Sequence, residues 1–267
     1  MGFLYSRKMS QRSRPPRGQH FLHDRGILER IATSLPTGEG RRVVEIGAGE
    51  GALTEFLLAA GARVTAIEID RVLAERLGGR FEGNEVFELV EGDVLEIDLA
   101  ALIAERSREP VLVAGNLPYY ITSPILRKVF NAAGQVEQAV FLMQREVAAR
   151  VTARKGSRDY GFLSVLCRLY AEPEYLFAVS AGAFRPPPRV TSAVVRLVMG
   201  RDRPVDLDFV KFAKSCFSQP RKKLLNNLSG RYDRTLLAGF EQSQRRAQEL
   251  DLEELLEFWA RLEAASK

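Results

Sequence analysis

The sequence predicts an α/β fold with a mostly parallel sheet, an antiparallel hairpin at one sheet edge and a small C-terminal helical domain. From about residue 40 to 145, short apolar stretches suited to buried strands alternate with amphipathic stretches suited to helices. After residue 160 two β-like stretches follow each other, and from about 206 onward the residues favour helices. Strands interleaved with helices in this way imply right-handed crossovers and a layered sheet.

The alternating region contains five expected strands, each with a helix after it. The strands are expected at 41–49, 63–70, 86–93, 110–116 and 138–144. The helices are expected at 52–61, 71–81, 99–107, 124–133 and 145–153. Ser123 and Pro124 form a suitable N-cap and first-turn pair, and they mark the start of the fourth helix.

The remaining segments complete the expected domain organisation. The stretches 164–180 and 192–199 are expected to pair as the antiparallel edge hairpin, and 200–206 reads as a linker. The C-terminal helices are expected to break at Pro220, near Gly230 and at Gly239. We therefore expect a basic, disordered lead at 1–17, an α/β domain at 18–200 and a helical domain at 206–267.

Composition excludes several classes of protein. With 46% hydrophobic residues the chain can bury a core. It has no uncharged apolar stretch of about 18 residues, and its first residues lack the apolar run of a secretory signal. The two cysteines, Cys167 and Cys216, suit a reducing compartment, and no cysteine or carboxylate cluster joins His20 and His23. We expect a cytoplasmic protein with no membrane association and no metal site.

Positive charge is concentrated in two segments. The net charge is +5; residues 1–23 carry five basic and no acidic side chains, and residues 211–234 carry seven basic side chains against Asp233 alone. Such patches on an otherwise balanced chain indicate a polyanionic partner, most simply a nucleic acid. A solubilising face plus a flexible tail explains the charge alone equally well.

Three glycines follow the first expected strand and predict a cofactor loop. Gly47, Gly49 and Gly51 would let the backbone turn sharply and approach a ligand closely. Glu68, at the end of the second strand, is placed to accept hydrogen bonds from two ribose hydroxyls, and Asp93, at the end of the third, is placed to contact an adenine. These carboxyl ends line one crevice that suits a nucleoside cofactor, either S-adenosylmethionine or NAD.

The fourth expected strand ends in Asn116, Leu117, Pro118 and Tyr119, beside the same crevice. An aromatic amine has two N–H groups, and the Asn116 side-chain oxygen can accept a hydrogen bond from one of them. The Leu117 carbonyl can accept a hydrogen bond from the other, and it is held in place because Pro118 restricts the preceding residue. Tyr119 can stack on a planar base. This arrangement favours S-adenosylmethionine and methyl transfer to an adenine, although asparagine and proline also simply form turns.

The sequence resembles the N6-adenine methyltransferases of ribosomal RNA, and within them the small-subunit rRNA adenine dimethyltransferases. The likeness covers about residues 17–230. It rests on GQHFL (18–22), VEIGAGEGALT (44–54), IEID (67–70), GD (92–93), GNLPYYIT (115–122), LMQREVAARV (142–151), YGFLSVLCRLY (160–170), FRPPPRVTSAVVRL (184–197) and FSQPRKKLLNNL (217–228). It implies a Rossmann-like class I S-adenosylmethionine-dependent methyltransferase fold.

The resemblance also implies roles for particular residues. The cofactor would be bound by His20, Leu22, Gly47, Gly49, Glu68, Asp93, Val94 and Asn116. Asn116, Leu117 and Tyr119 would hold the target adenine, with Phe184 as a second aromatic on its other face, unless Phe184 is a core residue at the hairpin end. Arg221, Lys222 and Lys223 would contact RNA phosphates, and Pro220 departs from the family pattern and can shift the start of that basic helix.

The implied activity is the dimethylation of two adjacent adenines in a hairpin loop near the 3′ end of small-subunit (16S) rRNA. The expected partner is that rRNA or a precursor of the small subunit, and the expected state is a monomer. Three alternatives stay open: a large-subunit (23S) rRNA dimethyltransferase that gives macrolide resistance, a non-catalytic RNA-binding assembly factor, and a dehydrogenase.

Overall fold

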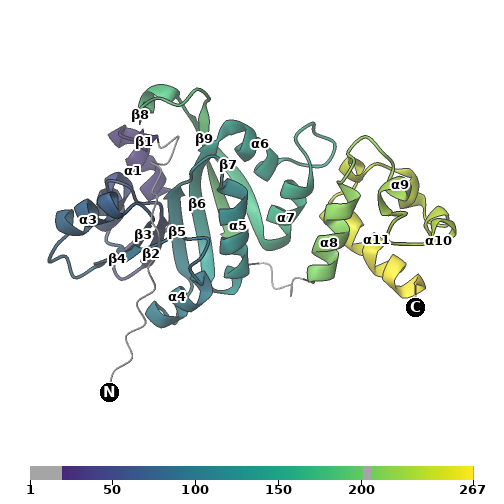
Figure 1. Cartoon of the computed structure of the whole chain (residues 1–267), viewed down its shortest axis with the longest axis horizontal. Helices are drawn as coiled ribbons and strands as arrows, with labels where there is room; N and C mark the ends of the chain where they lie inside the picture. The colour runs from purple at the N-terminus through teal and green to yellow at the C-terminus, as the bar shows by residue number, and fades with distance from the viewer. Residues whose placement is uncertain (1–19, 201–205, 267) are drawn as a thin grey trace, which may run out of the picture.

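A seven-stranded sheet forms the centre of the computed structural model, which describes residues 20–200 and 206–266 (Figure 1). The predicted lead at 1–17 and most of the predicted linker lie outside the described residues. The strand order is β4-β3-β2-β5-β6-β9-β7. The strands are β2 (Arg42–Ile46), β3 (Arg63–Glu68), β4 (Phe87–Glu91), β5 (Val111–Asn116), β6 (Val136–Gln144), β7 (Ala171–Val179) and β9 (Ser192–Met199).

The strand directions confirm the predicted sheet. The first five strands in this order pair in parallel, whereas β9 is antiparallel to both β6 and β7. The two late strands thus form the antiparallel edge that the sequence predicted. A second, two-stranded sheet pairs β1 (Phe21–Leu22) with β8 (Phe184–Arg185), and it ties the start of the described chain to the segment between β7 and β9.

Helices cover both faces of the sheet. One face is covered by α1 (Arg25–Thr33), α2 (Ala52–Ala59) and α3 (Arg71–Arg80), and the other by α4 (Leu99–Arg106), α5 (Thr122–Asn131), α6 (Arg145–Thr152) and α7 (Phe162–Tyr170). Because successive strand residues point to opposite faces, Val43 joins the first layer's core and Val44 the second's. Burial on both faces explains why the central strands β5 and β6 are mostly apolar, whereas the edge strands β4 and β7 carry acidic side chains. Short 3-10 turns lie at Ala133–Gln135 and Ala181–Ala183.

Two local predictions need correction, and one helix was not predicted. Residues 164–170 were expected to be β-like, but they belong to α7, which begins after Gly161, whose amide N donates to Ser164 Oγ at 3.1 Å. The helix α5 begins at Thr122, so Pro124 lies inside its first turn, where an N–H would have no intrahelical partner. The helix α1, capped by the Asp24 side chain, was not predicted.

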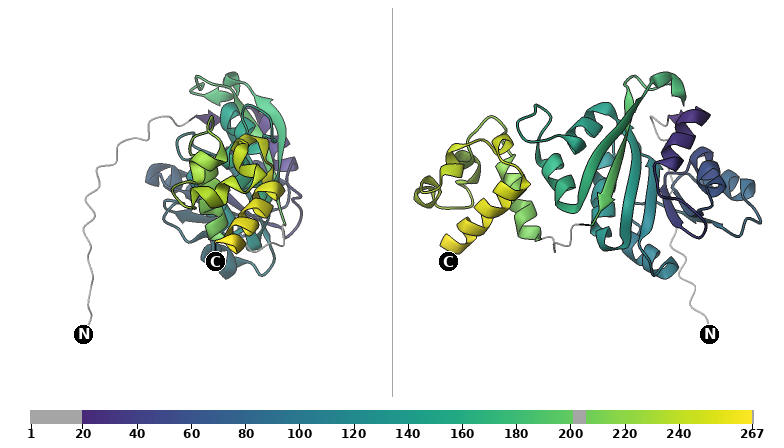
Figure 2. Two further views of the ribbon diagram at one scale, coloured as in Figure 1. Left: turned by 90° about the vertical axis from the view of Figure 1, so that its right-hand side faces the viewer. Right: turned by 180° about the vertical axis from the view of Figure 1, so that it is seen from behind.

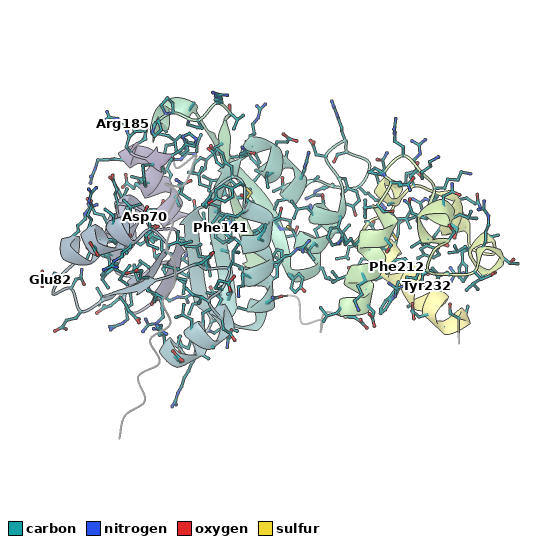
Figure 3. All side chains as sticks on the ribbon, viewed as in Figure 1. Asp70, Glu82, Phe141, Arg185, Phe212 and Tyr232 are labelled. Carbon is teal, nitrogen blue, oxygen red and sulfur yellow. The ribbon has the colours of Figure 1, made fainter. Side chains whose placement is uncertain are left out.

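The C-terminal helices pack beside α7 around a third hydrophobic core. They are α8 (Leu207–Cys216), α9 (Leu224–Leu228), α10 (Arg234–Ala238) and α11 (Leu252–Ala265), with 3-10 turns at Glu241–Gln244 and Ala247–Glu249. The view from behind in Figure 2 shows this group apart from the sheet, and Figure 3 shows Phe212 within it and Phe141 in the sheet. Its core also includes Val165 and Leu169 of α7, and the division of the chain into two domains stays a prediction. Among the described helices, none has the length and apolarity needed to cross a bilayer.

Candidate active site

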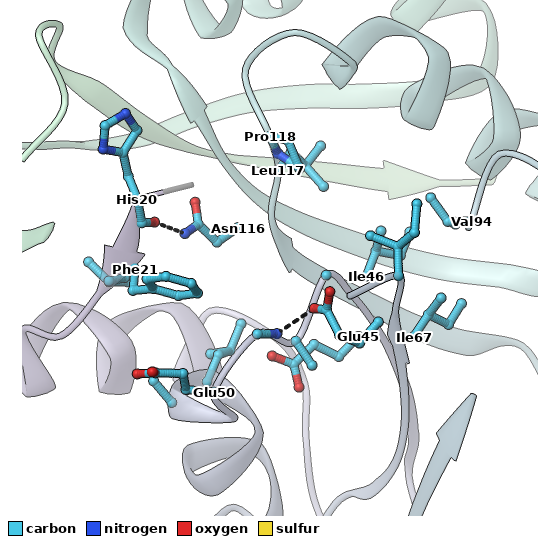
Figure 4. Close-up of a pocket in the computed structure, with 18 of the residues that line it drawn as sticks. His20, Phe21, Glu45, Ile46, Glu50, Ile67, Val94, Asn116, Leu117 and Pro118 are labelled. Carbon is cyan, nitrogen blue, oxygen red and sulfur yellow. Dashed lines mark hydrogen bonds between the residues drawn. The ribbon is translucent and has the colours of Figure 1, made fainter. Parts of the chain in front are cut away.

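A cavity of about 630 Å³ lies at the carboxyl ends of the parallel strands (Figure 4). Its walls come from the turns after β2, β3, β4 and β5 and from the segment that contains β1. This is the edge at which open parallel sheets bind their ligands, and the volume suits a small molecule. The predicted site residues that line the cavity are His20, Leu22, Gly47, Gly49, Glu68, Asp93, Val94, Asn116, Leu117 and Tyr119.

The turn after β2 is built on glycines in the left-handed region. The φ angles are +72° at Gly47, +58° at Gly49 and +80° at Gly51. A Cβ on Gly51 would lie 2.5 Å from Leu77 Cδ1, so packing against α3 accounts for the third glycine. A Cβ on Gly47 would meet only the Asn116 carbonyl oxygen, at 3.9 Å. Gly47 therefore faces the open cavity between the glycine turn and the end of β5.

Glu68 connects this turn to the end of β3. Its side chain is 4% exposed, and its Oε2 accepts a 2.7 Å hydrogen bond from the Gly49 amide. Its Oε1 accepts a 2.8 Å bond from the Asp70 amide. Two backbone donors therefore fix the carboxylate while each oxygen keeps acceptor capacity toward the cavity. That geometry suits a ligand that offers hydroxyl donors.

Glu45 is a buried carboxyl beneath the glycine turn, and it was not predicted as a site residue. It is 2% exposed, lines the cavity, and accepts a 2.6 Å hydrogen bond from Thr54 Oγ1. Desolvation raises the pKa of Glu45 to about 8; the nearby Glu68 charge also raises it, and the Thr54 hydrogen bond opposes the shift. A cation in the cavity would stabilise the ionised form of Glu45.

The turn after β4 presents an ordered acidic and apolar pair. The Asp93 Oδ1 accepts a 2.8 Å hydrogen bond from the Leu95 amide, which holds the carboxylate in place at the cavity. Val94 is 7% exposed and belongs to the core beneath the cavity. A hydrogen-bond acceptor beside an apolar surface suits the edge and face of a purine.

The end of β5 holds Asn116 against the segment that contains β1. The Asn116 Nδ2 donates a 2.9 Å hydrogen bond to the His20 carbonyl oxygen (Figure 4). A carbonyl oxygen can only accept, so it selects the nitrogen of the amide group. The Asn116 Oδ1 is therefore the atom left to accept from a ligand.

The next residues form a fixed wall. The Leu117 amide donates to the Leu142 carbonyl on β6 at 2.9 Å, and Leu117 is 1% exposed. The hydroxyl of Tyr119 lies 2.6 Å from Ser192 Oγ on β9. Burial raises the pKa of Tyr119, so the phenol stays neutral at physiological pH. The rings of His20 and Tyr119 stack with centroids 5.8 Å apart.

The structure does not bring Phe184 to the cavity, which corrects the expectation that its ring faces the target base. Phe184 is 2% exposed and packs in the core between the sheet and the α1–α3 layer. Its backbone pairs with Leu22, while the neighbouring Arg185 is the β8 residue that lines the cavity. In a two-residue strand the side chains alternate, and the ring is the one turned inward.

Comparison with known proteins decides the family. The ribosomal RNA adenine dimethylase profile matches residues 10–261. The chain is 45% identical over 268 aligned residues to a ribosomal RNA small subunit methyltransferase A of Acidobacterium capsulatum, with 97% of this chain and 94% of that protein covered. The chain belongs to the ribosomal RNA adenine dimethylase family. A Pseudomonas aeruginosa protein with the same name is 41% identical, with 81% and 82% of the two chains covered.

Solved structures agree with this membership of the dimethylase family. A dimethyladenosine transferase from Plasmodium falciparum superposes with a TM-score of 0.79 at 25% identity, over 92% of this chain and 98% of that one. The 23S rRNA methyltransferase ErmE superposes with a TM-score of 0.69 at 29% identity, over 91% and 99%. The predicted class I methyltransferase fold is confirmed, and membership identifies the chain as an S-adenosylmethionine-dependent rRNA adenine dimethyltransferase.

The basic residues predicted to bind RNA belong to the C-terminal helices and do not line this cavity. Arg221, Lys222 and Lys223 are exposed in the turn between α8 and α9. The helix α9 begins only at Leu224, so these three side chains precede the helix. The described residues hold no cluster of three or more histidine, cysteine or acidic side chains suited to a metal.

Sequence reasoning missed several residues of this dimethylase cavity besides Glu45. Phe21, Ile69 and Tyr120 line it. Ile69 is 59% exposed although it is apolar, because it directly follows Glu68 at the strand end. An apolar residue directly after the acidic end of a strand, as in IEID (67–70), is the sequence signal that could have been used.

Proposed function

We propose that this dimethylase family member uses S-adenosylmethionine to dimethylate N6 of two adjacent adenines in a hairpin loop near the 3′ end of small-subunit (16S) rRNA. The observation that carries the proposal is the Asn116 side chain, which lines the cavity and keeps its oxygen as an acceptor because its nitrogen is bound to the His20 carbonyl. The 45% identical relative is named as a small-subunit rRNA methyltransferase, which supports the choice of subunit.

The cavity fits S-adenosylmethionine in its charge and shape. Glu68 offers acceptors to ribose hydroxyls, and Asp93 and Val94 suit the adenine edge and face. The open space over Gly47 and the buried Glu45 suit the aminoacyl end, whose ammonium would favour the ionised carboxyl. His20, Leu22 and Gly49 complete this wall. When bound, the cofactor supplies an electrophilic methyl group on its sulfonium.

The β5 end would orient the adenine amine for in-line attack. Asn116 Oδ1 and the Leu117 carbonyl would each accept a hydrogen bond from one N–H group of the amine. These two bonds would draw the nitrogen lone pair out of conjugation with the ring and toward the methyl carbon. Tyr119, held by Ser192, stacks on the base. Because neither acceptor is a strong base, the proton that the methylated nitrogen loses passes to solvent.

Further parts of the proposal concern the setting. We place the protein in the cytoplasm, as a monomer, acting on small-subunit rRNA or on a precursor particle of that subunit. Arg221, Lys222 and Lys223 would bind phosphates of the same RNA outside the cavity. The hairpin would then reach from the α8–α9 turn to the sheet edge.

Methyl transfer to separated ribosomal subunits tests the proposal. Small subunits from cells that lack this protein, and large subunits as the second substrate, would be incubated with the protein and radiolabelled S-adenosylmethionine. We expect label on two adjacent adenines of small-subunit rRNA. Label in large-subunit rRNA alone would favour the 23S alternative suggested by the ErmE likeness. Binding of small subunits without label would favour an assembly factor.

A further inference from the structure

Tyr120 is an exposed aromatic side chain at the rim of the cavity. It is 69% exposed, one of the two most exposed large hydrophobic residues among the described ones, and it lines the cavity. It follows Tyr119 directly in the turn between β5 and α5. Tyrosine rings usually bury their faces, so one left in solvent beside a binding cavity indicates a ligand contact.

Hydrogen bonds hold the turn that carries Tyr120. The Pro118 carbonyl accepts from the Ile121 amide at 3.1 Å and from Thr122 Oγ1 at 3.2 Å. The Leu117 amide anchors the start of the turn to β6. The ring of Tyr120 is thus presented on a hydrogen-bonded turn, and within the described residues its side chain makes no aromatic-ring contact and no hydrogen bond.

Tyr119 and Tyr120 differ in their surroundings although they are neighbours. The Tyr119 hydroxyl is bound to Ser192 and its ring stacks with His20, which keeps it half-buried in the cavity wall. Tyr120 has its ring in solvent at the same rim. The turn therefore offers one aromatic ring in the cavity wall and a second, exposed one at the cavity rim.

We propose that Tyr120 stacks on the nucleotide next to the target adenine and so positions the target in the cavity. A base that leaves its stack exposes a face of its neighbour, and an aromatic side chain can cover that face without reading its sequence. Tyr120 is a positioning residue here, since it touches the flanking nucleotide and not the reacting amine. This inference rests on the proposed function.

A fluorescent hairpin RNA tests the inference. The loop carries two adjacent adenines, and two RNAs are made, each with a different one of these adenines replaced by 2-aminopurine. Because 2-aminopurine has no amine at C6, the remaining adenine is the target in each RNA. We expect fluorescence quenching on binding with the wild type and with Tyr120→Phe. Tyr120→Ala should lose the quenching and bind RNA about tenfold more weakly, which corresponds to about 1.4 kcal/mol.

Kinetics and a matched control separate positioning from folding. Tyr120→Ala should raise KM for RNA about tenfold, with kcat within about twofold and unchanged S-adenosylmethionine affinity by calorimetry. Tyr175→Ala, an exposed tyrosine on β7 outside the cavity, should behave as wild type. Quenching and KM unchanged in Tyr120→Ala would overturn the inference. If the wild type itself methylates neither RNA nor small subunits, the proposed function fails instead.

Discussion

Asn116 Nδ2 lies 2.9 Å from the backbone carbonyl oxygen of His20, and this contact joins two segments 96 residues apart. The partner is a backbone group, so any residue at position 20 can provide it. The orientation of the Asn116 side-chain amide therefore does not depend on which residue occupies position 20. The His20 ring has a separate contact, from Nδ1 to the Pro186 carbonyl at 2.7 Å. The segment before β1 thus sets the direction in which Asn116 presents its oxygen.

Replacement of Asn116 tests the amine grip. Asn116→Ala removes one of two acceptors for the target amine, and we expect kcat for methylation to fall by about 10²-fold or more. RNA binding should persist, because phosphate and stacking contacts are untouched. Asn131→Ala, an exposed asparagine at the end of α5, is the matched control. Filter binding and single-turnover methylation give the two readouts; unchanged methylation would refute the amine grip.

Glu68→Gln tests the cofactor wall. A carboxamide has one acceptor oxygen, so its NH₂ group must face one of the two backbone donors, Gly49 N or Asp70 N. We expect S-adenosylmethionine affinity to fall about 10- to 100-fold, the range for hydrogen bonds to a charged group. Glu91→Gln, at the paired register position on β4, should leave the affinity unchanged. Calorimetry measures both, and equal affinities for both variants would exclude a role for Glu68.

Much of the site was predictable because it follows strand ends. Parallel strands of one sheet bring their carboxyl ends to one edge, so Gly47, Glu68, Asp93 and Asn116 meet once the strands are identified. The central strands were recognisable because strands covered on both faces are mostly apolar.

The errors arose where a local pattern has two solutions. Residues 164–170 form an apolar run that suits a buried helix as well as a strand, and the Gly161–Ser164 hydrogen bond at its start depends on the fold. The orientation of Phe184 depends on the pairing of β8 with β1. In this pairing Phe184 lies opposite Leu22, which is 162 residues earlier in the chain. The burial of Glu45 depends on α2, which covers it through Thr54.

The pKa of Glu45 predicts a pH-dependent stability. The folded protein keeps the Glu45 proton up to about pH 8, whereas the unfolded chain releases it near the ordinary carboxyl value of 4.5. Between these values the folded state binds more protons, so the contribution of Glu45 to stability falls as pH rises, by at most about 1.4 kcal/mol per unit. Glu45→Gln, which mimics the neutral form, should remove this slope.

Urea unfolding at pH 5, 6.5 and 8 measures the effect. We expect the wild type to lose stability over this range relative to Glu45→Gln, with the two curves closest at pH 5. Bound S-adenosylmethionine should reduce the difference if its ammonium ionises Glu45. Parallel curves for the two proteins would show that Glu45 is already ionised in the folded state at pH 5.

The basic turn before α9 predicts a salt dependence of RNA binding. Arg221, Lys222 and Lys223 are exposed and precede the helix, so their side chains can reach phosphates of one strand. Replacing all three by alanine should reduce the slope of log K against log salt by about 2, at roughly 0.7 per phosphate contact for single strands. A charge-matched triple variant of Arg63, Arg76 and Arg108, exposed residues outside the cavity, should keep the wild-type slope. Equal slopes in both triple variants would place the RNA phosphates elsewhere on the protein.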